Sequence, residues 1–347
     1  MELRKKITNI LKEKKKLRLD KFIDFLLYKN NSYYTSKNPI GKKGDFVTSP
    51  EISQMFGEII GVYIINYWKN YLNSKFNLIE LGPGRCTLFN DIFRTSKIER
   101  SFINLADIFF VEKNDKLIKI QKENINKLKL KNVKWLSEFK TNSSNPSIIY
   151  SNEFFDCLPI RQFYQKDNWY EKFVIYNNEK DIFSFKDIVV KNKKLLNNLE
   201  KYNKTGIAEI SKERSVLFEN LCKHIVKNKG LIILVDYGYH TPIKNFTLQT
   251  ILNHKKTHIF DNIGNQDISS YVDFSELINI AKGFDLNIVN YCDQNNFLLS
   301  NGLNQRKKIL IKELTKEKQK IIINEYERLI SKQNMGKNFK FLIVSSI

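Results

Sequence analysis

The chain has 347 residues, of which 42% are hydrophobic and 13% aromatic, a composition that is typical of a folded globular protein and excludes global disorder. Its formal net charge is +21, but only nine of the 58 basic residues are arginines, and the lysines are spread along the whole chain. This dispersion favours a solvated, lysine-rich surface over a dedicated nucleic-acid site.

The four cysteines are widely spaced and form no Cys-x-x-Cys pair, so the sequence indicates neither a zinc site nor a disulfide framework. His254 and His258 lack a third ligand and are interpreted as part of a solvated helix face, so no metal site is predicted. The lysine-rich start carries acidic residues, unlike a transit peptide, and no apolar run is long enough to span a membrane. We therefore predict a cytoplasmic protein.

The spacing of apolar residues predicts helices over residues 17–28 and 52–71, with a loop rich in Gly, Thr, Ser and Pro over residues 41–50. Short apolar runs then alternate with helical stretches, which predicts βαβ units and a mostly parallel sheet covered on both faces. The predicted strands are 78–81, 108–111, 133–136, 148–150, 231–235 and 286–289.

Two further segments depart from the alternation of strands and helices. Residues 160–187 are aromatic and alternating, which predicts an antiparallel insertion, and residues 339–344 can pair as an extra strand. We predict an N-terminal helical segment with a cofactor-covering loop at 1–74. A core at 75–347 would follow, with an insertion at about 160–210.

The stretch LIELGPGRCTLFN, residues 78–90, combines an apolar run, an acidic residue, a Gly-Pro-Gly turn and the start of a helix. A nicotinamide fingerprint would need a third glycine, which is missing here. Glu80 before Gly82, Pro83 and Gly84 instead fits an S-adenosylmethionine site, because glycines admit the ligand to the backbone and a helix N-terminus favours its carboxylate. The alternative is a plain turn between strand and helix.

Glu112 follows the next predicted strand. At that position an acidic side chain can accept hydrogen bonds from both ribose hydroxyls of an adenosyl group. The alternative is an acidic surface residue at a strand end. Taken with the glycine turn, Glu112 favours S-adenosylmethionine over nicotinamide.

The stretch SNEFFDCLPI, residues 151–160, ends the fourth core strand. Many amino-group methyltransferases have Asn/Asp-Pro-Pro-Tyr/Phe at this place, and here Asn152 and Phe155 keep the outer positions. Glu153 and Asp156 add two carboxylates, which a guanidinium substrate needs, because its pKa exceeds about 12 and the site must hold a cation. The alternative is that both carboxylates cap a following helix.

Seven ordered stretches resemble the MidA family of S-adenosylmethionine-dependent methyltransferases and cover the chain nearly end to end. They lie at 44–58, 79–88, 151–160, 231–239, 247–277, 296–303 and 335–344. The resemblance implies an α/β fold with a Rossmann-like seven-stranded core, an N-terminal helical segment and inserted substructure. It also implies protein-arginine N-methylation, with symmetric dimethylation, of the large peripheral-arm subunit of NADH:ubiquinone oxidoreductase (complex I) during its assembly.

The resemblance implies further that the loop from Asp45 to Pro50 folds over the cofactor, which brings Thr48, Ser49 and Pro50 to it, with Glu51 or Gln54 facing the mouth. The residues alone predict a helix start there, with Ser49 as N-cap and Pro50 in the first turn. We predict that Asn152, Glu153, Asp156 and Glu51 are catalytic and that Asn152 also contacts the cofactor. Asp236, at the end of strand five, either walls the site or only turns the chain.

Cys86 stands where family members have a glycine. If that residue has a positive φ, a side chain there costs about 1 kcal/mol, and if it faces the ligand it blocks the site. Two other function classes therefore stay open. One is a nucleic-acid amino-methyltransferase, which the charge and Asn152 would suit; the other is a catalytically silent assembly factor.

Overall fold

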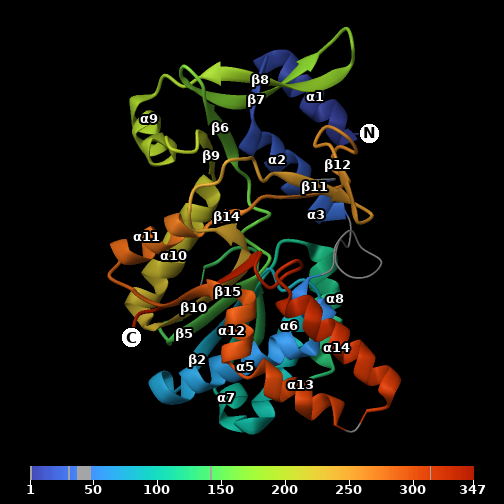
Figure 1. Cartoon of the computed structure of the whole chain (residues 1–347), viewed down its shortest axis with the longest axis vertical. Coiled ribbons are helices and arrows are strands. Elements are labelled where there is room, and N and C mark those ends of the chain that lie inside the picture. The colour runs from blue at the N-terminus through green and yellow to red at the C-terminus, as the bar shows by residue number, and fades with distance from the viewer. Residues whose placement is uncertain (1, 30–31, 37–47, 141–142, 313) are drawn as a thin grey trace.

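The computed structural model describes residues 2–29, 32–36, 48–140, 143–312 and 314–347. Its larger part is a sheet with helices on both faces, and a smaller part of N-terminal helices and antiparallel strands lies at one end of it (Figure 1). Most of the predicted loop at 41–50, and residues 45–47 of the predicted covering loop, lie outside the described residues.

The main sheet has eight strands in the order β15-β16-β10-β5-β2-β3-β4, with β14 beside β10. Neighbouring strands from β4 to β10 are parallel, and β16 is antiparallel to both of its neighbours. The strands are β2 (Phe76–Leu81), β3 (Ala106–Val111), β4 (Val133–Leu136), β5 (Ser147–Asn152), β10 (Gly230–Tyr239), β14 (Val272–Asp273), β15 (Asn287–Asp293) and β16 (Phe339–Ser345). The predicted α/β fold with a mostly parallel sheet is confirmed.

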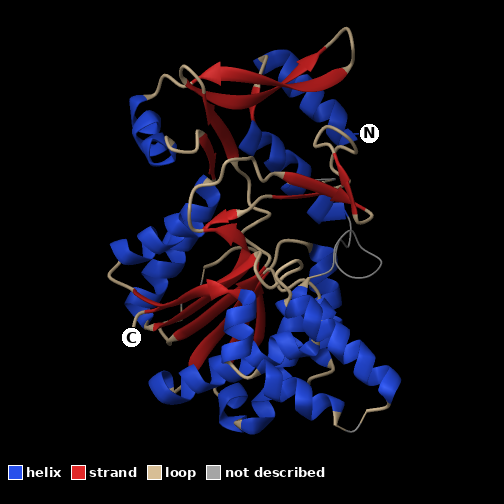
Figure 2. Ribbon diagram, in the orientation of Figure 1, coloured by secondary structure: helices blue, strands red, loops and turns tan. Residues whose placement is uncertain are grey.

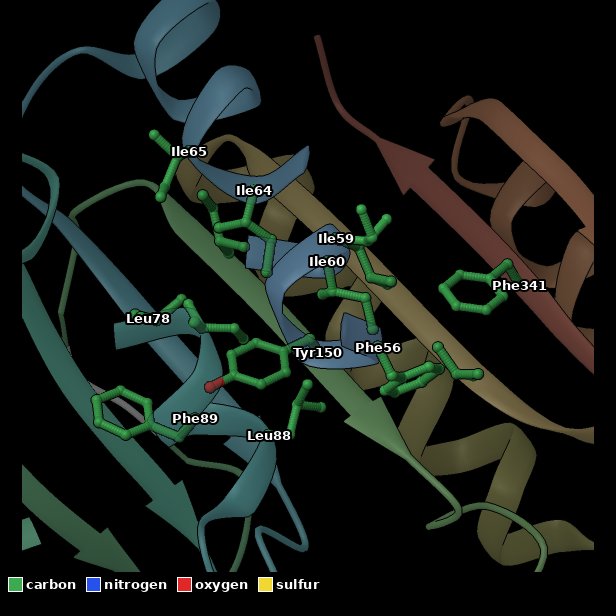
Figure 3. Packing of buried hydrophobic residues seen from close by; sticks show 14 of the residues in the cluster. Phe56, Ile59, Ile60, Ile64, Ile65, Leu78, Leu88, Phe89, Tyr150 and Phe341 are labelled. Atoms are coloured by element: carbon green, nitrogen blue, oxygen red, sulfur yellow. The ribbon is translucent and has the colours of Figure 1, made fainter. Parts of the chain in front are cut away.

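Helices cover both faces of this sheet because its central strands are apolar on both sides (Figure 2). Leu78 and Tyr150 point to the face covered by α5, as Figure 3 shows, whereas Ile79 and Ile149 join the opposite cluster. Successive side chains of a strand point to opposite faces, so continuous apolar runs build two cores.

The helices fall into two groups around the sheet. One face is covered by α5 (Gln54–Tyr67), α6 (Thr87–Thr95), α7 (Arg100–Asn104), α12 (Gln294–Ser300), α13 (Leu303–Ile311) and α14 (Lys316–Ile330), together with a residue of α8 (Asp115–Asn126). The other face is covered by α10 (Lys212–Asn228) and α11 (Phe274–Gly283). The short helices α4 (Ser49–Ile52), α9 (Lys193–Leu199), η2 (Ser96–Ile98) and η3 (Glu200–Tyr202) connect these elements.

The smaller part contains residues from both sides of the predicted domain boundary at residue 74. The insertion forms β6 (Arg161–Gln165), β7 (Trp169–Asn177), β8 (Ile182–Val189) and β9 (Ile207–Ile210), and β7 also pairs with β1 (Leu17–Arg18). The helices α1 (Glu2–Lys14), α2 (Leu19–Tyr28) and α3 (Tyr33–Ser36) share one hydrophobic cluster with these strands. The predicted division at residue 74 stays a prediction.

A third sheet follows β10 and was absent from the sequence prediction. It consists of β11 (Gln249–Leu252), β12 (Lys255–Thr257) and β13 (Asp267–Ser269). Asn253 and His254 both have positive φ, 50° and 61°, in the two-residue turn between β11 and β12. The interpretation of His254 and His258 as a helix face is therefore wrong, because His254 lies in this hairpin turn and His258 follows β12.

Two predicted helices need corrected boundaries. The helix predicted at 17–28 begins at Leu19, because Leu17 and Arg18 pair with β7 instead. The helix predicted at 52–71 is α5, continued by a π-helical turn, η1 (Trp68–Leu72). Of the helices in the described part of the chain, none is both long and apolar enough to cross a membrane.

We expect the substitution Gly57→Ala to destabilise the fold. A Cβ at Gly57 of α5 would lie 2.5 Å from the Cβ of Asp91 on α6, so the two helices would have to separate. Overpacking of this kind costs about 1 to 3 kcal/mol, which thermal unfolding would show as a lower Tm. Gly283→Ala is the matched control, because a Cβ there meets nothing within 4 Å, and an unchanged Tm in Gly57→Ala would contradict the predicted packing.

Candidate functional site

A cavity of about 440 Å³ opens beyond the carboxyl ends of β2, β3 and β5. Ligands of open α/β sheets bind in this position. The helices α2 and α3 of the smaller part line its other side, through Asp24, Tyr28 and Tyr34. The cavity therefore lies between the main sheet and the N-terminal helices.

The glycine turn after β2 forms the floor of the cavity. Gly82 and Gly84 have positive φ, 62° and 55°, and both line the cavity together with Pro83. A Cβ on Gly82 would lie 2.4 Å from Cδ2 of Phe154, so the turn also packs tightly against the neighbouring loop. Glycine is required here both by the conformation and by the space.

Cys86 adopts the left-handed conformation that the family glycine would favour, with a φ of 64°. Its side chain is fully buried in the core beneath α6, and burial raises the pKa of its thiol. Cys86 is not among the described residues that line the cavity. The substitution therefore adds backbone strain of about 1 kcal/mol without placing a side chain in the ligand's space.

Glu112 lines the cavity at the end of β3, and three hydrogen bonds hold its carboxylate in place. Its Oε1 accepts from the N–H groups of Lys113 and Asn114, both at 2.9 Å. Its Oε2 accepts from Nε2 of Gln121 at 3.2 Å, and this amide also donates to the carbonyl of Gly84 at 2.9 Å. Because each carboxylate oxygen has two lone pairs, Glu112 keeps capacity for one further donor, at Oε2.

Glu80 also lines the cavity, and its carboxylate is buried. Oε2 accepts a hydrogen bond from the hydroxyl of Tyr150 at 3.1 Å. Burial raises the pKa of Glu80 to about 8, with the Tyr150 bond opposing the rise. A cation bound nearby would lower this pKa again and hold the carboxylate in its charged form.

The segment 153–157 follows β5 as a tight turn, so the interpretation of its carboxylates as caps of a following helix is wrong. Glu153 has a φ of 52°, which is rare for a side chain with a Cβ and typical of functional sites. Its Oε1 accepts from the N–H of Ser49 at 3.1 Å and from Nδ2 of Asn152 at 3.0 Å. Burial, followed by the charge of Asp156, raises the pKa of Glu153 to about 8.

Asn152 and Asp156 occupy different environments on either side of Glu153. Asn152 lines the cavity, and its Oδ1 is buried without a hydrogen-bond partner among the described residues. Asp156 is buried, with 8% of its surface exposed, and is not among the described residues that line the cavity. Burial raises the pKa of Asp156 to about 6, and the charge of Arg214 opposes the rise.

Asp236 holds the turn 153–157 from the end of β10. Its Oδ2 accepts from the N–H groups of Phe154, Phe155 and Asp156 at 3.2, 2.8 and 3.2 Å. Its Oδ1 accepts from the N–H of Tyr237 at 2.9 Å. Asp236 is not among the described residues that line the cavity. Its contacts therefore favour a role in positioning the turn 153–157 over direct contact with a ligand.

Arg214 of α10 holds the same turn from the opposite direction. The buried guanidinium donates from Nε to the carbonyl of Phe155 at 2.7 Å and from Nη2 to that of Asp156 at 3.0 Å. It also donates to the carbonyls of Tyr271 and Ser270 at 2.8 and 3.0 Å, before β14. One arginine thus ties two loops together at the site.

The segment entering α4 lies against the same turn. Thr48 is the N-cap residue, without a side-chain cap bond, so the predicted cap at Ser49 is displaced by one residue. Thr48, Pro50 and Glu51 line the cavity, while the Ser49 side chain is buried outside it. Glu51 accepts from the hydroxyl of Thr87 on α6, and its Oε2 lies 3.7 Å from Nη1 of Arg85.

The charge of the cavity is opposite to that of the chain. Among the described lining residues, seven are carboxylates and three are cations, although the whole chain carries +21. The carboxylates are Asp24, Glu51, Glu80, Glu112, Glu138, Glu153 and Glu213, and the cations are Lys29, Arg85 and Lys113. An acidic cavity in a basic protein favours cationic ligands over phosphates.

These residues fit S-adenosylmethionine, which carries a sulfonium and an ammonium group. The glycine turn lines the cavity at Gly82 and Gly84, and Glu112 offers a fixed carboxylate for a hydroxyl donor. The buried, unpaired Oδ1 of Asn152 provides a further acceptor within the described part of the cavity. Glu80 supplies a buried carboxylate beside the turn for a cationic amino group.

The strand order and the glycine turn define the class of the protein as a methyltransferase of the Rossmann-like type. The family of S-adenosyl-L-methionine-dependent methyltransferases known as Methyltransf_28 matches residues 59–292. The chain belongs to this family, and its cofactor is S-adenosylmethionine. The predicted cofactor and the predicted family are thereby confirmed.

Similar proteins are found over nearly the whole chain. "Protein arginine methyltransferase NDUFAF7, mitochondrial" of Rattus norvegicus is 30% identical over 336 residues, covering 89% of this chain and 76% of the relative. The human protein of the same name is 29% identical over 335 residues, covering 89% and 75%. The fold matches a Burkholderia thailandensis protein solved with S-adenosyl-homocysteine, with a TM-score of 0.86, 20% identity and coverage of 99% and 91%.

The names of these relatives contradict the predicted cytoplasmic location, since they are called mitochondrial. That prediction was based on the composition of the first residues. Leu3, Ile7 and Leu11 of α1 are buried in the hydrophobic cluster of the smaller part. The lysine-rich start is therefore a folded helix with one buried apolar face.

The sequence analysis missed several residues that shape the site. Gln121, Arg214, Tyr28 and Tyr34 each lie far along the chain from the motifs they contact. Single polar or aromatic residues on helices have no periodic signal of their own. One signal for Arg214 was available from the sequence, because it lies at a position of α10 that faces the apolar core. A buried arginine is rare unless its charge has a partner.

We expect Gly82→Ala to weaken binding of S-adenosyl-homocysteine by about tenfold or more, because the new methyl group collides with Phe154 and displaces the turn. Isothermal calorimetry would measure the affinity. Gly206→Ala is the matched control, since Gly206 has a similar φ of 66° and its nearest neighbour would be 3.7 Å away. An unchanged affinity in folded Gly82→Ala would show that the turn does not hold the cofactor.

We also expect Glu112→Ala to lower cofactor affinity by about 1 to 3 kcal/mol, because it removes a charged acceptor from a buried position. Calorimetry would be compared with Glu123→Ala, an exposed residue of α8. If the Tm of Glu112→Ala falls while its affinity equals that of the control, Glu112 only anchors the start of α8.

Proposed function

We propose that the protein is a protein-arginine N-methyltransferase. The observation that carries this proposal is the acidic cavity with Glu153 in its wall, which suits a guanidinium as methyl acceptor. The names of the relatives support the same activity. A guanidinium stays charged at neutral pH, so only a site that neutralises a cation can bind it away from water.

We propose that Glu153 acts on the acceptor. S-adenosylmethionine would supply the methyl group by breaking its S–CH3 bond, which leaves S-adenosyl-homocysteine. Glu153, fixed by Ser49 and Asn152, accepts a hydrogen bond from the guanidinium and takes up the proton that the nitrogen loses as the new bond forms. A pKa of about 8 suits this role, because the carboxylate can exchange a proton near neutral pH.

Asp156 contributes to this step from a buried position. Its charge is one of the causes that raise the pKa of Glu153, after burial. We propose that Asp156 sets the proton affinity of Glu153 rather than gripping the substrate itself. Glu51, bonded to Thr87 at the start of α6, would hold the mouth against the cofactor turn.

The proposed substrate is a subunit of complex I, the large peripheral-arm subunit that the family resemblance implies, and the proposed compartment is the mitochondrion. We further propose symmetric dimethylation of the target arginine. The antiparallel strands β6 to β8 offer an extended surface for docking a protein substrate. The basic surface of the enzyme would steer it to an acidic partner.

The two other function classes find less support in the structure. Nucleic acid would bring phosphates to a cavity in which seven carboxylates face three cations among the described lining residues. A silent assembly factor was suggested by Cys86, but that side chain is buried in the core beneath α6. Both alternatives become outcomes of the experiment below.

We expect Glu153→Gln to reduce methyl transfer by about 100-fold or more while leaving cofactor affinity within a few-fold. The purified peripheral-arm subunit would be the substrate, with mass spectrometry locating the methylarginine and distinguishing symmetric from asymmetric products. Glu317→Gln, an exposed residue of α14, is the control. Parental activity in Glu153→Gln would remove the chemical basis of the proposal, and methylation of RNA or DNA instead of protein would replace it.

The pH dependence tests the same carboxylate independently. Because the pKa of Glu153 is raised to about 8, its charged form increases as pH rises toward 8, and kcat/KM should rise with it. Asp156→Asn removes a negative charge that raises this pKa, so the rise should move to lower pH. An unshifted profile in Asp156→Asn would show that another group controls the rise.

A further inference from the structure

The N-terminal helices place two stacked tyrosines in the wall of the cavity. Tyr28 ends α2 and Tyr34 lies in α3; their ring centroids are 5.6 Å apart and their planes are inclined by 17°. Both residues line the cavity. Their positions lie outside the methyltransferase core, in the smaller part of the molecule (Figure 1).

The hydroxyl groups of both tyrosines donate hydrogen bonds to the protein. Tyr28 donates to the carbonyl of Cys157 at 2.9 Å, on the turn that carries Glu153. Tyr34 donates to Oδ1 of Asp267 at 3.1 Å. The hydroxyls therefore anchor the rings, and the aromatic surface itself is what contributes to the cavity wall.

Carboxylates surround the same place. Asp156 and Asp267, both buried, act on Glu153 closely enough to raise its pKa. Glu213 lines the cavity as well, and its Oε2 is buried without a hydrogen-bond partner among the described residues. An aromatic surface beside several carboxylates is suited to a delocalised cation, which stacks on rings and donates to oxygens.

Many other rings of the chain already carry one of its own cations. Lys172 lies over Tyr164, and Lys307 lies 3.6 Å from the ring centroid of Tyr326. In the described part of the structure, no lysine or arginine lies over Tyr28 or Tyr34. Lys29, the nearest basic residue in sequence, is paired with Asp24 at 3.0 Å.

We propose that Tyr28 and Tyr34 form the subsite for the acceptor side chain, where an alkylguanidinium stacks on the aromatic wall with its donors toward Glu153. This inference rests on the proposed function, because it names the groups that select the cationic acceptor. It assigns substrate choice to α2 and α3 rather than to the glycine turn. The two tyrosines are thus specificity-determining residues.

The test combines binding of a small probe with kinetics. Butylguanidinium and its neutral isostere butylurea would be titrated into the parent and into Tyr28→Leu and Tyr34→Leu, each with S-adenosyl-homocysteine present. We expect the leucine variants to lose about 3- to 30-fold in butylguanidinium affinity, the usual range for a lost cation–π contact, and little in butylurea affinity. The KM for the arginine substrate should rise by a similar factor, with kcat within about threefold.

Matched variants separate the ring from its hydroxyl. Tyr28→Phe and Tyr34→Phe lose the hydrogen bonds to Cys157 and Asp267 but keep the aromatic ring. Because the ring is what binds the cation in this proposal, their butylguanidinium affinity should stay within about threefold of the parent's. Tyr71→Leu, with 58% of its surface exposed outside the cavity, controls for the loss of a tyrosine. The Tm of each variant shows whether it is folded.

The outcomes distinguish this inference from the proposed function. Equal butylguanidinium affinity in parent and leucine variants overturns the inference, whatever the activity of the parent. A fall in S-adenosyl-homocysteine affinity with unchanged butylguanidinium affinity also overturns it, because the rings would then serve the cofactor. A parent that binds butylguanidinium through these rings but methylates no protein arginine would overturn the proposed function alone.

Discussion

The site depends on how the short turn 153–157 is held in a strained conformation. Glu153 adopts a positive φ of 52°, which costs about 1 to 3 kcal/mol for a residue with a Cβ. Asp236 binds three consecutive N–H groups of the turn, and Arg214 binds two of its carbonyls from the other side. Both groups are buried, and backbone groups of the turn supply hydrogen bonds to each of them. The two side chains thus fix the backbone of the turn, and the backbone places Glu153 in the wall of the cavity.

The same arrangement explains how a strongly basic chain can bind cations. The lysines are spread over the surface, where water and salt screen them, whereas the carboxylates of the cavity other than Glu138 are partly or fully buried. At short range the local charge decides what binds, and the surface charge influences only how partners approach. Burial also raises the pKa of Glu80 and Glu153 to about 8. Near neutral pH both groups are therefore largely protonated until a bound cation lowers their pKa. Ligand binding and ionisation are therefore coupled in this site.

The core strands and the glycine turn could be predicted from sequence because their signals are local. Central parallel strands such as β2 and β5 are apolar on both faces, and a turn that needs positive φ selects glycine. The pairing of β1 with β7 could not be predicted, because it joins Leu17 to Val174, which lie nearly half of the chain apart. Gln121 and Arg214 were missed for the same reason, since their roles arise from contacts with distant backbone groups. The sequence alone shows that Cys86 replaces a family glycine, but only the structure shows that its side chain is buried in the core.

The cavity joins two parts of the chain that have different constraints. The main sheet supplies the glycine turn and Glu112, which line the cavity at the ends of β2 and β3. The N-terminal helices supply Asp24, Tyr28 and Tyr34, and they are held in place by a separate hydrophobic cluster and by β1 on the inserted strands. Tyr28 and Ser49 bond directly to the turn 153–157, so the N-terminal part and the core meet at the residues proposed to contact the acceptor. The family thus identifies the cofactor, while the choice of acceptor is proposed to depend on elements outside the methyltransferase core.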